Sequence, residues 1–80
     1  MSENISNNAL ILALLSLNGE IALQRDYLES DDIPDEDVAD EEEVLGDLEQ
    51  AFMEFVEVYK ARAKHDESLP SLDDLLAGEA

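Results

Sequence analysis

Carboxylates are the only abundant side chains in this sequence that could do chemistry. Asp and Glu number 22 of the 80 residues, against 4 Lys and Arg, so the formal net charge is −18. Carboxylate oxygens suit Ca²⁺ or Mg²⁺, and two carboxylates in one pocket can act as acid and base. The densest run of aspartates is Asp31, Asp32, Asp35 and Asp37. No glycine lies between Gly19 and Gly46. An EF-hand loop needs a central glycine, so we expect no specific metal site.

Other reactive groups are scarce. The chain has no cysteine, which excludes a disulfide framework and a thiolate metal site. His65 is the single histidine and lies among charged neighbours, as expected at a solvated helix end. Carboxylates need a pocket to separate their pKa values before they can catalyse. We therefore expect no catalytic residue and no cofactor, and a protein that is not an enzyme.

The acidic residues are concentrated in one part of the chain. From Asp26 to Glu57 there are 15 acids and no base, and 11 of them fall between Asp35 and Glu57. On a helix those 11 would span about 33 Å, or one negative charge per roughly 3 Å. One strand of duplex DNA carries one charge per about 3.4 Å. The run is therefore as densely charged as a nucleic-acid strand.

Two segments have the spacing of amphipathic helices. The first, about residues 7–30, has apolar residues at intervals of three, four and seven: Leu10, Leu14, Leu17, Ile21 and Leu28. The second, about residues 38–64, has the clearest heptad pattern: Leu45, Leu48, Phe52, Phe55 and Tyr59. Residues 30–37 are polar, contain Pro34 and predict the break between these helices. Glu41 falls on the apolar side of the second helix, which predicts that its first turns project past the hairpin.

A third, short helix is predicted over about residues 71–77. Ser71 and Asp74 have the spacing of a capping box, and Leu72, Leu75 and Leu76 share one face. At the other end of the chain, Ser6 or Asn7 is a suitable cap for the first helix. The sequence thus predicts one all-α domain over residues 1–80: an antiparallel helical hairpin with a short C-terminal helix.

The first helix is apolar over a wider arc than one partner helix can cover. We expect the apolar residues beside the main stripe of this helix to form an oligomer interface: Ile11, Leu12, Leu15 and Ala22. Exposed apolar strips usually mark contacts, so our first expectation is a homodimer that forms a four-helix bundle. The alternative is a monomer in which the tail helix covers Ile11 and Leu15.

The charge pattern indicates what such a protein would bind. Its sign argues against direct binding to nucleic acid or to an anionic membrane. A basic protein surface, above all that of a nucleic-acid-binding protein, is the expected partner. The residues expected to contact it are on the outer side of the second helix and just before it: Glu36, Asp40, Glu43, Asp47, Glu54 and Glu57.

In size and charge the chain resembles the small acidic proteins by which phages block host restriction or CRISPR machinery. That resemblance implies an inhibitor that mimics DNA and occupies a host protein's nucleic-acid site. Two other functions fit the same composition: a chaperone or antidote for a basic protein, and a structural homo-oligomer whose acids only confer solubility.

The longest apolar run, Ala9 to Leu15, is shorter than the roughly 20 residues of a membrane span. The segment before it has no Lys or Arg. We therefore expect a cytoplasmic protein, in the host cytoplasm if it is virus-encoded.

Overall fold

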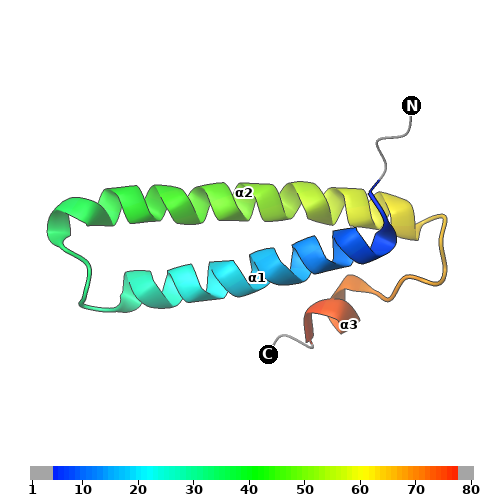
Figure 1. The fold of residues 1–80 in the computed structure, drawn as a ribbon, viewed down its shortest axis with the longest axis horizontal. Coiled ribbons are helices and arrows are strands. Elements are labelled where there is room, and N and C mark those ends of the chain that lie inside the picture. Colours follow the sequence, from blue (N-terminus) through cyan, green and yellow to red (C-terminus); the bar gives the residue numbers. More distant parts are fainter. Residues whose placement is uncertain (1–4, 78–80) are drawn as a thin grey trace.

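The chain folds into the predicted helical hairpin with a short C-terminal helix. The computed structural model describes residues 5–77; the first four and last three residues of the predicted domain lie outside this range. Helix α1 spans Asn7–Glu29, the 3₁₀ turn η1 spans Asp35–Asp37, α2 spans Val38–Ala63 and α3 spans Leu72–Ala77. Figure 1 shows α1 and α2 side by side and antiparallel, with α3 folded back beside the N-terminal half of α1. The described residues contain no strand, so the all-α prediction is confirmed.

The ends of the two long helices follow from local chemistry. The Ser6 hydroxyl accepts a hydrogen bond from the Ala9 amide at 3.0 Å, which satisfies one of the free N–H groups that begin α1. At the other end, the Ser30 backbone N–H donates to the Tyr27 carbonyl at 3.1 Å. Pro34 follows in the connection, and its fixed φ suits the entry into η1 and α2.

The core lies between the helices toward the N-terminal end of α1. Four buried residues form one cluster: Leu10, Leu14, Val56 and Tyr59. Six half-buried residues pack against it: Ile11, Phe52, Phe55, Leu69, Leu72 and Leu75. Three of these six come from α3 and the segment just before it. The short helix therefore covers an apolar flank that the hairpin alone would leave exposed.

A hydrogen bond connects α2 to the segment that begins α3, which is called the lid below. The Tyr59 hydroxyl donates to the Pro70 carbonyl oxygen, and only 1% of the Tyr59 residue surface is exposed. Burial raises the pKa of Tyr59, and the negative charge of Asp66 raises it further. The Ser71 hydroxyl then accepts from the Asp74 amide at 3.1 Å, as the predicted cap requires. The phenol thus links the core of the hairpin to the start of α3.

The structure shows how the acid on the inner side of the first turn of α2 is accommodated. Gln24 of α1 donates from Nε2 to the backbone oxygen of Glu41 at 3.0 Å and to its Oε1 at 2.8 Å. Glu41 therefore lies beside α1, whereas Figure 1 shows η1 and the very start of α2 extending beyond the end of α1. The amide group of Gln24 provides a polar partner for an acid on the inner side, a contact that the apolar pattern does not reveal.

Candidate protein-binding surface

An acidic face runs along α2 on the side away from α1. It consists of the six predicted contact residues, Glu36, Asp40, Glu43, Asp47, Glu54 and Glu57, and all six are exposed. Glu36 belongs to η1 and the other five to α2. At 100° per residue the five fall within one sector, opposite the sector of Phe52 and Tyr59. The packing of the α2 core side therefore directs these carboxylates to solvent.

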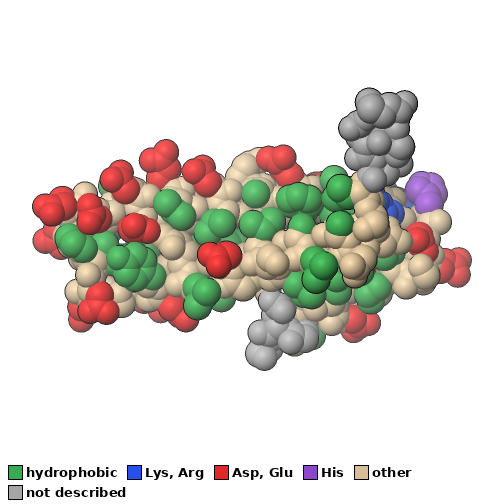
Figure 2. All heavy atoms as spheres, in the orientation of Figure 1, with side chains coloured by type: hydrophobic (Ala, Val, Ile, Leu, Met, Phe, Trp, Pro, Cys, Tyr) green, Lys and Arg blue, Asp and Glu red, His purple; other side chains and the backbone are tan. Residues whose placement is uncertain are grey.

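Few acids near this face have a countercharge. Among residues 5–77 the one ion pair joins Arg25 Nη2 to Glu49 Oε2 at 2.6 Å. Glu49 and Glu41, which Gln24 binds, lie on the side of α2 toward α1. Eleven acids lie between Asp35 and Glu57, and removing these two leaves nine, all exposed. In Figure 2 acidic side chains follow the edge over α2 and gather at the turn end of the hairpin.

Three of the four basic residues lie at the opposite end of the hairpin. Lys60 and Arg62 are in the last turn of α2, and Lys64 follows it. Cations are favourable there because the helix dipole is negative at its C-terminus. Asp66 and Glu67 lie at the same end, so this end is close to neutral whereas the turn end of the hairpin is strongly acidic.

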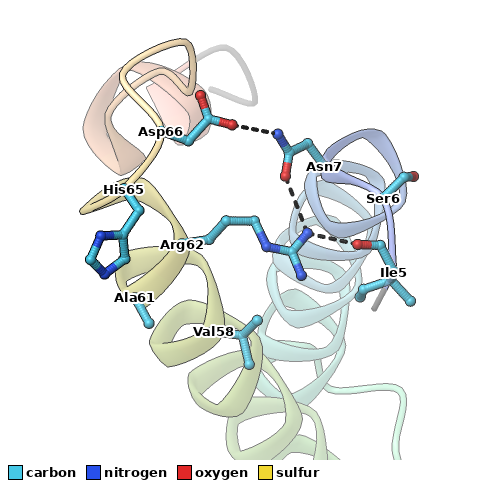
Figure 3. Close-up of a pocket in the computed structure, with 8 residues that line it drawn as sticks. All are labelled: Ile5, Ser6, Asn7, Val58, Ala61, Arg62, His65 and Asp66. Atoms are coloured by element: carbon cyan, nitrogen blue, oxygen red, sulfur yellow. Dashed lines mark hydrogen bonds between the residues drawn. The ribbon is translucent and has the colours of Figure 1, made fainter. Parts of the chain in front are cut away.

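Arg62 ties the start of α1 to the end of α2, as Figure 3 shows. Its Nη1 donates to the Ile5 carbonyl at 2.7 Å and to Asn7 Oδ1 at 3.1 Å. Asn7 Nδ2 in turn donates to Asp66 Oδ2 at 3.0 Å. These polar groups line a shallow hollow at this end of the molecule. Their bonds to one another join three segments of the chain.

Asp66 accepts several hydrogen bonds in this cluster. The hydroxyl and backbone N–H of Ser68 both donate to Asp66 Oδ1, and Asn7 donates to Oδ2. These bonds favour the ionised carboxylate, so they lower the pKa of Asp66, the Ser68 hydroxyl most strongly; nearby Arg62 lowers it further. The sequence pattern did not single out Asn7, Asp66 or Ser68 for this role, because long-range polar contacts have no periodic signal.

The predicted oligomer residues do not share one environment. Ile11 is half-buried and packs against the core with α3, and Leu15 is also half-buried. Leu12 is 55% exposed, and Ala22 is exposed. Within the single chain, Ile11 and the leucines of α3 pack against the same core cluster. Leu23, which widens the apolar arc of the first helix but was not among the expected interface residues, is at 64% the most exposed large apolar residue described.

Two further features bear on the choice of function. Within residues 5–77, no three His, Asp or Glu side chains converge as a metal ion would need. In the same range, no helix combines the length and apolar character needed to cross a membrane. Comparisons with protein-family models, curated proteins and solved structures give no match to this chain.

Proposed function

We propose that this protein is a binding inhibitor that uses its acidic face to occupy the nucleic-acid-binding site of a basic partner protein. The observation that carries the proposal is the acidic face of α2. Five of its six carboxylates are exposed on one side of α2 and the sixth, Glu36, is exposed in the turn just before it; none belongs to an ion pair in residues 5–77. A groove that binds phosphates presents Lys and Arg at similar intervals.

The spacing of the charges supports this kind of partner. The nine exposed acids from Asp35 to Glu57 span about 33 Å at 1.5 Å per residue, or roughly one charge per 4 Å. A DNA strand has one per about 3.4 Å. A rigid helix holds its carboxylates at fixed intervals, so association costs little further ordering of the backbone. Such a field also speeds encounter with a basic groove, most strongly at low salt.

The face also has a cost for the fold. Glu43 and Asp47 are like charges at i and i+4, an arrangement that destabilises a helix by about 0.2–0.5 kcal/mol. Solubility alone does not need an unmixed arrangement, since interspersed Lys and Glu also keep a surface polar. A basic partner, by contrast, requires a surface of one sign.

We also propose that two copies associate into a four-helix assembly. Leu12 and Leu23 are 55% and 64% exposed on the outer side of α1, away from the acidic face. Burying such residues removes apolar surface from water, worth about 25 cal/mol per Å². A dimer formed through α1 leaves the acidic face of each α2 free for a partner.

The test begins with capture of the partner. The immobilised protein is exposed to host lysate, and the retained proteins are eluted with duplex DNA or with salt. The proposal expects a nucleic-acid-binding protein that DNA displaces. A basic partner that nucleic acid does not displace would instead indicate a chaperone or antidote. Retention of only further copies of this chain would indicate a structural oligomer.

Two charge-matched variants then locate the contact on the captured partner. Reversal of the acidic face with Glu43→Lys and Asp47→Lys is expected to weaken binding by tenfold or more. The control, Asp73→Lys and Asp74→Lys, makes the same change in net charge at exposed positions of α3. It is expected to weaken binding far less. Equal affinities for the two double variants would show that net charge, and not the acidic face, governs binding.

A further inference from the structure

A second heptad seam runs along α1 on the side away from α2. It consists of Leu12, Ser16, Gly19 and Leu23, at spacings of 4, 3 and 4 residues. The two leucines and Ser16 are exposed, and Gly19 is half-buried. Spacing by threes and fours is the pattern by which one helix packs against another. The core uses a different side of α1, that of Leu10 and Leu14.

The seam is self-complementary when two copies run antiparallel. Its residues read large, small, small, large, and both sizes and spacings are the same in either direction. In an antiparallel pair, Leu12 of one copy meets Leu23 of the second. Ser16 of one copy then meets Gly19 of the second. The small residues allow the helices to approach closely at the centre, and a leucine pair closes each end.

The charges of α1 select this antiparallel direction. Residues 7–19 contain no charged side chain, and every charge of α1 lies in residues 20–29. In a parallel pair Asp26, the next position of the seam, would face Asp26 of the second copy, and such a like-charge contact is unfavourable. In the antiparallel register the charged half of each helix faces the uncharged half of the other. Residue 20 then lies opposite residue 15, and residue 26 opposite residue 9.

The ends of the hairpin support the same direction. The acidic connection between α1 and α2 lies at one end, and Lys60 and Lys64 lie at the other, beside the start of α1. Antiparallel association brings the acidic end of each copy to the end of the second that carries Lys60 and Lys64 together with Asp66 and Glu67, where the opposite charges nearly balance. For a chain of net charge −18, this arrangement keeps the two acidic ends apart and so lowers the repulsion between copies.

We propose that the α1 seam is the homodimer interface, with the two α1 helices antiparallel and Leu12 paired with Leu23 of the second copy. This inference rests on the proposed dimer and names its surface. The proposed contact is thus not at Ile11, which packs against the core, but on the outer side of α1. The acidic faces remain on the two α2 helices, on the outside of the assembly.

Molar mass in solution tests the surface. Light scattering during size exclusion is expected to give twice the 8.9 kDa of the chain for the unmodified protein. The double variant Leu12→Glu, Leu23→Glu is expected to be monomeric with unchanged helical circular dichroism. Met53→Glu in α2, at a position 52% exposed, is the control and is expected to remain dimeric. An unmodified protein that is monomeric overturns the dimer itself. A Leu12, Leu23 variant that stays dimeric overturns only the seam.

Cysteine cross-linking tests the direction, because the chain has no cysteine of its own. Ala9→Cys and Asp26→Cys are prepared with tags of different mass and oxidised separately and as a mixture. The antiparallel register brings positions 9 and 26 of different copies together, so the disulfide is expected only in the mixture. Cross-linking of either variant with itself, and not in the mixed pair, indicates a parallel dimer and overturns the register.

Discussion

Asn7 and Asp66 are 59 residues apart in the chain and joined by a hydrogen bond of 3.0 Å between Asn7 Nδ2 and Asp66 Oδ2. The bond connects the first residue of α1 to the segment between α2 and α3. Asn7 also accepts from Arg62 through its other amide atom, at 3.1 Å. One asparagine therefore holds three segments together at the end of the hairpin where α3 folds back.

The first prediction concerns the pH dependence of this contact. The lowered pKa of Asp66 in the folded chain means that its ionised form contributes stability above the pKa of the unfolded state. That contribution is lost as pH falls through the folded pKa. We expect Asp66→Asn to be less stable than the unmodified protein at pH 7, with a difference that closes as pH falls toward about 2.

Urea unfolding at several pH values measures this difference. Both proteins share the other 21 acids, so the general effect of protonating a highly acidic chain cancels in the comparison. A stability difference that does not change with pH would mean that the Asp66 carboxylate is not selectively stabilised in the folded state.

The second prediction concerns Gly46, which interrupts α2 at an exposed position. A Cβ added there would meet no atom within 4 Å. Alanine is favoured over glycine in a helix by about 0.8–1.0 kcal/mol, so Gly46→Ala should stabilise the protein by nearly that amount. The melting temperature should rise by several degrees, since about 1 kcal/mol corresponds to roughly 4–8 °C in a domain of this size. An unchanged or lower melting temperature would contradict the open environment found at this position.

The third prediction concerns the cost of the acidic face. Glu43→Gln with Asp47→Asn removes a like-charge pair from exposed helix positions with little change in shape. We expect a gain of a few tenths of a kcal/mol in low salt, because like charges at i and i+4 destabilise a helix. The gain should shrink at 1 M salt, where the Debye length is about 3 Å. If the proposed function holds, the same variant binds its partner less tightly. A loss of stability on neutralisation would show that these carboxylates make favourable contacts in the fold.

The fourth prediction concerns the lid. Tyr59→Phe keeps the buried ring and removes the hydrogen bond to the Pro70 carbonyl. Loss of one such bond costs about 0.5–1.5 kcal/mol. Hydrogen exchange should become faster in residues 69–77, while the amides of Leu14 and Val56 keep their protection. Tyr27→Phe is the control, because Tyr27 is 41% exposed. Equal exchange in both variants would mean that packing alone holds α3.

The sequence was sufficient for the helices because their signals are local. The heptad of Phe52, Phe55 and Tyr59 and the cap at Ser6 each depend on neighbours within a few residues. The same periodicity assigned the six acids of the acidic face to the outer side of α2, where all are exposed. A helix of known phase places each side chain at a known angle, so these positions needed no tertiary information.

Tertiary structure decided what covers the apolar flank of α1 and which polar groups meet. Periodicity showed that Ile11 and Leu15 needed a cover, but it left α3 and a second copy as alternatives. The folded chain packs Ile11 and the leucines of α3 against the same core cluster and leaves Leu12 and Leu23 exposed. Likewise, Glu41 had to face α1, but only the packed hairpin showed Gln24 beside it. Such contacts depend on how far the chain folds back along itself, and this distance is set by the packing of the whole core and not by any local pattern.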